Sequence, residues 1–260
     1  MSYMTVLYDV GEGVATITLN RPEAMNSMTH GLKAELLKVL QEARRDDSVR
    51  SVLITGAGRA FSAGQDLREH LENLQSGRGM DDVVRRFYNP IVEALTDMEK
   101  PVVAAVNGVA AGAGASLAFA CDLRVAAEGA SFLMAFARVG LAPDTGVSWT
   151  LQRLIGAGRA MELMLLAEPV DARRALELGL VHRVVPDALE NARELALRLA
   201  QGPTTSYGAI KRAIGFASAH PLRQALELEA ELQDRCGATE DHLNATLAFV
   251  NKEKPVFTGR

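Results

Sequence analysis

The amino-acid sequence predicts an α/β fold with a helical C-terminal region, on three observations. Short apolar runs that end at glycine-containing turns alternate with longer segments of helical periodicity through the first half of the chain. The order strand, strand, helix, strand begins at the N-terminus, and a later helix again returns the chain to a strand. Beyond Gly156 the pattern is almost entirely helical.

The composition indicates a globular protein with one sizeable core. The 260 residues carry a net charge of -4, and 48% of them are hydrophobic. Because the charges are interspersed and aromatic residues are few, no nucleic-acid partner is expected. No stretch resembles a secretory leader or a membrane span, so we expect a cytoplasmic protein with no membrane partner. Cys121 and Cys236 lack the spacing of a disulfide framework and are expected to be reduced thiols.

The first elements are expected to be a hairpin, a helix and a buried strand. Apolar residues alternate or run together over 6–10 and 14–19, on either side of Gly11-Glu12-Gly13. The leucines of segment 29–45 recur at helical spacing. The short apolar run 49–55, which ends at a glycine, is typical of a buried strand.

The chain then leads to the strand around which the remaining elements are arranged. Residues 59–67 form a small-residue turn, in which Asp66 is favoured as the N-cap of a following helix. We expect the charged stretch 68–80 to be mobile and a helix to run over 82–98. The apolar run 102–106 is then the central strand.

The C-terminal half is expected to consist mainly of helices. Asp122 and Glu128 bracket one more short strand, and Asp171 has the position of an N-cap. Helices are expected over 147–154, 159–167, 171–178, 188–201, 204–219 and 221–251. The last of them carries leucines on one face and charged residues on the other, a pattern that buries against the same chain or a neighbour.

The turn after the central strand, from Gly108 to Gly114, admits several interpretations. It resembles a dinucleotide-binding turn, but Leu117 stands where the third glycine is required. It also resembles a degraded nucleophile elbow, in which Ser116 would be an acyl-transfer nucleophile. Its small residues alternatively allow a helix to pack closely on the sheet, or allow backbone N–H groups to bind a developing oxyanion. The last interpretation needs a second donor, which the Ala63-Gly64-Gln65 turn could supply.

One carboxylate stands out for its apolar surroundings. Asp144 lies among Leu141, Ala142, Val147 and Trp149 in the sequence, where loss of hydration would raise its pKa and its basicity. Such a group can remove a proton beside an unsaturated system and return it at another carbon. The alternative is that Asp144 only caps the helix that follows.

Four ordered motifs span nearly the whole chain. They are Asn20-Arg21-Pro22 with Met25-Asn26-Ser27, the stretch 58–67 (GRAFSAGQDL), the stretch 101–122, and Gly156 with the helices after it. Together they resemble the crotonase (enoyl-CoA hydratase/isomerase) superfamily. The resemblance implies a spiral of strand-strand-helix repeats over residues 1–200 and a C-terminal helical trimerisation region over 201–260. It therefore also implies a homotrimer or a dimer of trimers.

The same resemblance implies an acyl-CoA substrate, in which coenzyme A is part of the substrate and no separate cofactor is used. Backbone N–H groups of Gln65 and of Ala113 or Gly114 would hold the thioester oxygen and stabilise an enolate. The positions implied to contact coenzyme A are Arg21, Met25, Ala63, Asp66 and Leu67. Those implied to line the acyl pocket are Phe87, Phe136 and Trp149.

The resemblance also bears on which reaction of the superfamily this chain performs. Family hydratases use two glutamates, and the corresponding positions here hold Ser116 and Phe136, which disfavours hydration. Asp144 lies where isomerases of the superfamily place their single carboxylate. Its flanking residues match best the ring-epoxide isomerases of phenylacetate catabolism. One departure is Val147, which replaces a glycine usual in the family.

We therefore expect an isomerase of acyl-CoA thioesters with Asp144 as its acid/base. It would open ring-1,2-epoxyphenylacetyl-CoA to the oxepin, shift the double bond of a Δ3-enoyl-CoA to Δ2, or both. The alternatives are a 2-enoyl-CoA hydratase, an acyl hydrolase that uses Ser116, and a CoA-binding protein without turnover. The five histidines are scattered along the chain, so no metal site is expected.

Overall fold

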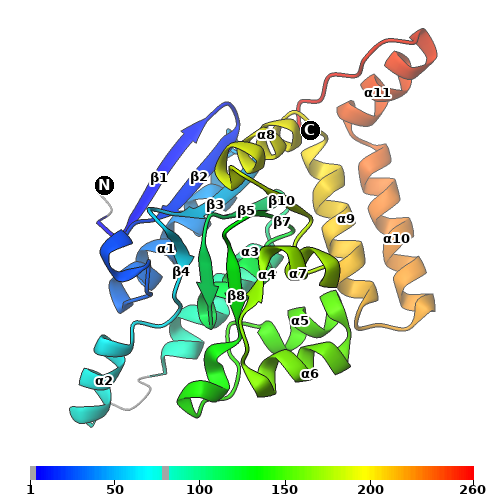
Figure 1. The fold of residues 1–260 in the computed structure, drawn as a ribbon. Helices are drawn as coiled ribbons and strands as arrows, with labels where there is room; N and C mark the ends of the chain where they lie inside the picture. The colour runs from blue at the N-terminus through cyan, green and yellow to red at the C-terminus, as the bar shows by residue number, and fades with distance from the viewer. Residues whose placement is uncertain (1–3, 78–81) are drawn as a thin grey trace.

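The computed structural model describes residues 4–77 and 82–260, which form two sheets surrounded by helices (Figure 1). The strands are β1 (Val6–Gly11), β2 (Val14–Leu19), β3 (Ser51–Gly56), β4 (Ala60–Ser62), β5 (Val102–Val106), β6 (Val109–Ala111), β7 (Leu123–Ala127), β8 (Ser131–Leu133), β9 (Val170–Asp171) and β10 (Arg183–Val185). The α-helices are α1 (His30–Arg45), α2 (Leu67–Gln75), α3 (Asn89–Thr96), α4 (Ala113–Ala120), α5 (Val147–Ile155), α6 (Ala157–Leu166), α7 (Ala172–Leu178), α8 (Ala188–Ala200), α9 (Thr204–Ala217), α10 (Leu222–Gly237) and α11 (Glu240–Asn251). Shorter helical segments are Pro22–Ala24 and Ala135–Val139, both 3-10 helices, and a π-helical turn at Val84–Tyr88. The predicted α/β class is confirmed.

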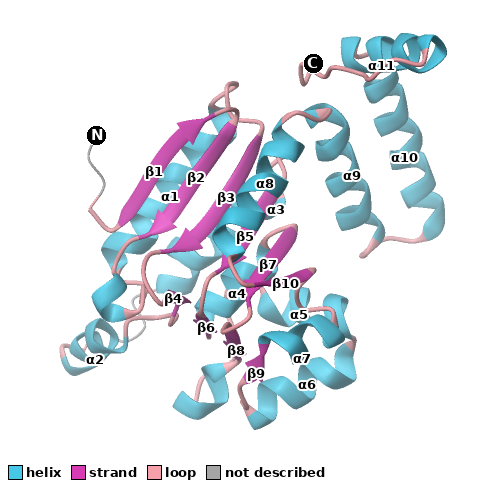
Figure 2. Cartoon of the chain, turned by 45° about the horizontal axis from the view of Figure 1, so that its top comes forward, coloured by secondary structure: helices cyan, strands magenta, loops and turns pink. Residues whose placement is uncertain are grey.

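The larger sheet has the strand order β1-β2-β3-β5-β7-β10, and all neighbours except the β1–β2 hairpin are parallel. Helices cover both of its faces (Figure 2). Ile54 and Ala104 face the core that contains α1, whereas Leu53 and Val103 face a second core against α8. Because alternate residues of β3 and β5 are buried on opposite faces, these strands have continuous apolar sequences. The predicted hairpin, helix 29–45 and central strand are confirmed.

The smaller sheet has the order β4-β6-β8-β9, with β8 and β9 antiparallel and the other pairs parallel. Its strands are two or three residues long, too short for the period-2 pattern to be recognised in the sequence. The sequence analysis therefore missed all of them. This sheet brings the turn that follows β4 next to the turn that follows β6.

The segment expected to be mobile contains a helix, α2. Asp66 accepts hydrogen bonds from the N–H groups of Arg68 and Glu69, so it is the N-cap of α2, as predicted. Most of stretch 68–80 is thus helical, its mobility stays a prediction, and 78–81 lie outside the described residues. The helix predicted over 82–98 is present as the π-helical turn at Val84–Tyr88 followed by α3.

The last three helices form an arm that projects from the core (Figure 1). The single helix predicted over 221–251 is wrong, because the chain breaks between α10 and α11, where Thr239 accepts a hydrogen bond from the N–H of His242 and caps α11. Leu228 and Leu232 of α10 are buried against α9. The other leucines of the predicted face are exposed: Leu222, Leu226, Leu243 and Leu247. Across the part of the chain that the structure describes, no helix combines the length and the apolar character needed to cross a bilayer.

Candidate active site

Two glycine-containing turns touch each other at the edge of the small sheet. Gly64 has φ +84°, and a Cβ at this position would lie 2.6 Å from the carbonyl oxygen of Ala111 and 3.1 Å from the backbone nitrogen of Ala113. A Cβ on Gly114 would collide with the carbonyl oxygen of Ser62. The absence of side chains at these two positions therefore lets the chain at Gln65 approach the start of α4.

This approach brings together backbone N–H groups whose hydrogen bonds have no acceptor within the described chain. Gln65 and Met28 form a parallel bridge, in which the N–H of Met28 binds Gly64 O and the N–H of Asp66 binds Met28 O. The bridge therefore leaves the N–H of Gln65 unused. The N–H groups of Ala113 and Gly114 lie in the first turn of α4, where no intrahelical acceptor exists. Donors of this kind suit a developing oxyanion.

Asp144 lies in the turn that precedes α5 and is partly buried. Its Oδ1 accepts a 2.7 Å hydrogen bond from the hydroxyl of Thr145, a residue held at φ +52°. The N-cap of α5 is Gly146, which has no side-chain capping bond, so the alternative that Asp144 caps this helix is not supported. Burial raises the pKa of Asp144, and the Thr145 hydrogen bond and the positive charge of Lys33 oppose that rise. The carboxylate is therefore more basic than an exposed aspartate.

A cavity of about 90 Å³ joins the carboxylate to the two turns. It is lined by Ala63, Gln65, Leu67, His70, Val83, Tyr88, Gly112, Ala113, Ala135, Phe136, Val139, Leu141 and Asp144. Most of these side chains are apolar, and Asp144 is the sole carboxylate among the described lining residues. The fold thus gathers six of the residues that the sequence analysis selected: Ala63, Gln65, Leu67, Ala113, Phe136 and Asp144.

Other selected residues lie outside this cavity. Trp149 is 44% exposed, lies under the guanidinium of Arg153 and borders a separate hollow beside α9. Phe87 makes an edge contact with the His30 ring. Neither aromatic ring lines the cavity that contains Asp144, so of the three predicted acyl-pocket residues only Phe136 lines it. Arg21, Met25, Asp66 and Gly114 are also absent from the lining.

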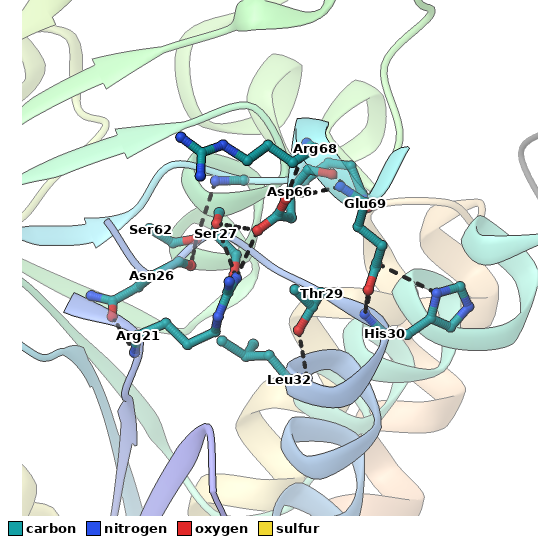
Figure 3. A network of polar contacts seen from close by, with 12 residues as sticks. Arg21, Asn26, Ser27, Thr29, His30, Leu32, Ser62, Asp66, Arg68 and Glu69 are labelled. Carbon is teal, nitrogen blue, oxygen red and sulfur yellow. Dashed lines mark hydrogen bonds and ion pairs between the residues drawn. The ribbon is translucent and has the colours of Figure 1, made fainter. Parts of the chain in front are cut away.

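A polar network fixes the turn that carries Gln65 (Figure 3). Oδ2 of Asp66 accepts hydrogen bonds of 2.8 Å from Arg21 Nη1 and from the Ser27 hydroxyl, while its Oδ1 caps α2. Burial raises the pKa of Asp66, but the hydrogen bonds from Arg21, from the Glu69 N–H and from Ser27 outweigh it and lower the pKa to about 2. Asp66 therefore remains ionised at neutral pH and ties Gln65 to the N-terminal loop.

Sequence reasoning missed two residues that contact the Gln65 side chain. Nζ of Lys33 donates to Gln65 Oε1 at 2.9 Å, and the Tyr88 hydroxyl donates to the same oxygen at 2.7 Å. Lys33 lies among the apolar positions of α1, and a lysine on the buried face of a helix was a signal that could have been followed. Tyr88 gave no such signal, because core packing accounts equally well for an aromatic residue.

Ser116 does not reach the cavity. It is fully buried within α4, and its hydroxyl donates to the carbonyl oxygen of Gly112 at 3.0 Å. This arrangement is that of a helix-interior serine and not of an exposed nucleophile. Among residues 4–77 and 82–260, no three His, Cys, Asp or Glu residues are grouped as metal ligands would be.

The sequence was compared with protein families and with curated proteins. A family model described as enoyl-CoA hydratase/isomerase matches residues 9–260. A protein from Escherichia coli (strain K12), named 1,2-epoxyphenylacetyl-CoA isomerase, is 44% identical over 258 residues and covers 98% of each chain. A protein from Rhodobacter capsulatus, named a probable enoyl-CoA hydratase, is 42% identical over 262 residues and covers 100% of each chain.

The fold was also compared with solved structures. A protein from Mycobacterium abscessus, provisionally assigned as an enoyl-CoA hydratase/isomerase, has a TM-score of 0.95 to this structure at 45% identity, covering 98% of this chain and 100% of that one. The similarities thus extend over whole chains. The relatives carry both isomerase and hydratase names.

Proposed function

This chain belongs to the enoyl-CoA hydratase/isomerase family and has the crotonase fold, and we propose that it isomerises an acyl-CoA thioester. One observation carries the proposal: a single, partly buried carboxylate, Asp144, lines the same small, mostly apolar cavity as Gln65 and Ala113, the residues with the unused backbone N–H groups. Isomerisation needs one group that removes a proton and returns it elsewhere, whereas hydration normally needs two groups. The cavity matches the first requirement.

The chemistry follows from these positions. The thioester oxygen accepts hydrogen bonds from the N–H groups of Gln65 and Ala113, which stabilise negative charge on that oxygen. The ionised Asp144 removes a proton from a carbon beside the unsaturated system, which leaves a dienolate. The now protonated Asp144 returns the same proton at another carbon, so no atom is gained or lost. Burial favours the removal step, because it makes Asp144 a better base than an exposed aspartate.

Two substrates undergo a proton transfer of this kind, and we propose the ring-1,2-epoxide of phenylacetyl-CoA first and a Δ3-enoyl-CoA second. With the epoxide, the C–C bond shared by the epoxide and the six-membered ring must also break to give the seven-membered oxepin, and this ring expansion neither adds nor removes an atom. The E. coli relative named for the epoxide reaction supports this order. The main alternative is a 2-enoyl-CoA hydratase, which the name of the R. capsulatus relative favours. Against it, Ser116 is sealed within α4 and Phe136 cannot ionise, so neither predicted glutamate position supplies a second group.

Product mass distinguishes these reactions. Wild-type protein is incubated with crotonyl-CoA, a 3-enoyl-CoA and freshly generated ring-1,2-epoxyphenylacetyl-CoA, and products are followed by mass spectrometry. We expect conversion of the epoxide or the 3-enoyl thioester without a change in mass, and little addition of water to crotonyl-CoA. Rapid gain of one water by crotonyl-CoA identifies a hydratase. A protein that binds these thioesters and converts none of them is a CoA-binding protein, and the proposal fails.

A serine variant tests the hydrolase alternative. Because the Ser116 hydroxyl is buried and bonded to Gly112 O, Ser116→Ala is expected to keep kcat within roughly twofold of wild type, as a substitution outside the site should. Release of free coenzyme A is measured in parallel with a thiol reagent. If wild type releases thiol and the alanine variant does not, Ser116 is a nucleophile and the isomerase assignment is wrong.

The contacts to coenzyme A, the assembly of subunits and the location in the cell are also proposals. We propose contacts to coenzyme A from Ala63 and Leu67, which line the cavity, and from Arg21, Met25 and Asp66, which do not. We also propose a cytoplasmic homotrimer or dimer of trimers. The exposed leucines of α10 and α11 support that assembly, because contiguous exposed apolar side chains mark interaction surfaces.

A further inference from the structure

Lys33 is a fully buried ammonium group beside the proposed site. It projects from α1, is 0% exposed, and its hydrogen-bond acceptor is the side-chain oxygen of Gln65 at 2.9 Å. Its Nζ also lies 5.2 Å from the centroid of the Tyr88 ring. An ammonium group has three donors, so one acceptor and an aromatic face compensate only part of its lost hydration. Because burying the Lys33 ammonium group costs free energy of hydration, we expect this charge to have a function at the site.

The Gln65 side chain is held from two sides. Oε1 of Gln65 accepts from Lys33 Nζ and from the Tyr88 hydroxyl, which come from separate helical segments. Burial, together with the negative charges of Asp144 and Glu69, raises the pKa of Tyr88 well above its usual value, so this hydroxyl stays a donor. The backbone N–H of Gln65 is the proposed oxyanion donor, and fixing its side chain restricts rotation of that peptide.

Charges from several elements face Lys33. Burial lowers its pKa to about 8, and the negative charges of Glu69, Asp144 and Asp66 oppose that change. The coupling is mutual, because the charge of Lys33 opposes the rise that burial causes in the pKa of Asp144. The other titratable or charged groups nearby are Tyr88, His30 beside Glu69, His70 in the cavity wall, Arg21 on Asp66, and Arg86 over the Phe87 ring.

We propose that Lys33 is a positioning residue for the isomerisation: its ammonium fixes the Gln65 side chain and holds Asp144 in the ionised form that accepts the proton. This role rests on the function proposed above. Lys33 does not line the cavity, so it does not contact the reacting carbon. It acts through its hydrogen bond to Gln65 and through the electrostatic effect of its positive charge on Asp144. In this arrangement burial makes the single aspartate more basic, and the positive charge of Lys33 opposes the loss of its ionised form.

The first test measures the ionisation of Asp144 without any turnover. Protein labelled with ¹³C at aspartate Cγ is titrated by NMR, and the Asp144 resonance is identified by its absence in Asp144→Asn. Lys33→Met is expected to raise the pKa of Asp144, whereas Lys33→Arg and the control Lys38→Met, a lysine on the same helix, are expected to leave it near the wild-type value. An unchanged pKa in Lys33→Met overturns the proposal. If that variant does not fold, wild type alone decides, because its Asp144 resonance must show a second inflection near pH 8 as Lys33 loses its proton.

The second test measures turnover of the substrate that wild type converts. Lys33→Met is expected to lower kcat about tenfold or more with KM nearly unchanged, the effect of losing roughly one charge-assisted hydrogen bond. Wild-type kcat should fall on the alkaline side with an apparent pKa of about 8, and Lys33→Arg should move that limb to higher pH because a guanidinium keeps its proton. A structural lysine would not move the limb. If wild type converts no thioester, the proposed function fails, while the NMR titration still decides the role of Lys33.

Discussion

Asp144→Asn is expected to lower kcat for thioester isomerisation by about 10²–10⁴-fold, the range over which a positioned general base contributes. Asparagine has nearly the same shape and can still accept the Thr145 hydrogen bond through its Oδ1, so the turn before α5 should be preserved. It cannot take up a proton from carbon, however. The measurement is kcat and KM for the substrate whose product keeps its mass. Affinity for butyryl-CoA, which has no double bond to move, should change little.

Asp171→Asn is the control that distinguishes loss of the general base from a structural effect of replacing aspartate by asparagine. Asp171 is exposed and caps α7 through the N–H of Arg174, and asparagine caps a helix about as well as aspartate. Asp171→Asn should therefore behave like wild type in both turnover and stability. If Asp144→Asn retains turnover within a few-fold of wild type, another group removes the proton and the mechanism proposed here is incorrect.

How far the sequence predicts the fold depends on the length of each signal. The hairpin and α1 are long enough to show a period, β5 is recognisable as a continuous apolar run, and Asp66 and Asp171 have recognisable capping positions. Segment 68–80 was predicted to be mobile because it is charged, although Leu67, Leu71 and Leu74 have helical spacing. All three leucines are exposed, so the Asp66 cap stabilises α2 and a buried apolar face does not. The strands of the small sheet pair across long intervals of sequence and carry no local pattern.

Some residues of the candidate site could be predicted from the sequence, and others could not. Gln65, Ala113 and Asp144 lie in turns rich in glycine and small residues, and such turns are visible in a sequence because few residues tolerate their geometry. The contacts of Gln65 with Lys33 and Tyr88 span 32 and 23 residues of sequence. No spacing rule connects positions so far apart. Trp149 was assigned from its proximity to Asp144 in the sequence, but its ring lies under the guanidinium of Arg153 and borders the hollow beside α9, and it does not line the cavity that contains Asp144.

Gly64→Ala is expected to have the second largest effect on activity, because it acts on the distance between the two turns. The new Cβ would lie 2.6 Å from Ala111 O and 3.1 Å from the nitrogen of Ala113, so the turn after β4 must move away from the turn that joins β6 to α4. Moving one oxyanion donor out of place should lower kcat by about 10²–10³-fold, comparable with deleting such a donor. Strain at φ +84° should add roughly 1–3 kcal/mol of lost stability, measured by urea unfolding.

Gly179 supplies the control, because it has the same φ of +84°. A Cβ added there would lie 3.8 Å from its nearest neighbour, Leu154 O, which is an ordinary van der Waals contact. Gly179→Ala therefore carries the backbone cost without the collision, and it lies at the end of α7, away from the cavity. It should lose roughly 1–3 kcal/mol of stability through the same backbone strain and keep its kcat. If the two alanine variants lose stability and activity in the same proportion, lower stability alone explains the loss in Gly64→Ala. If instead only Gly64→Ala loses kcat, the close approach of the two turns is required for the reaction, as an oxyanion site shared between Gln65 and Ala113 demands.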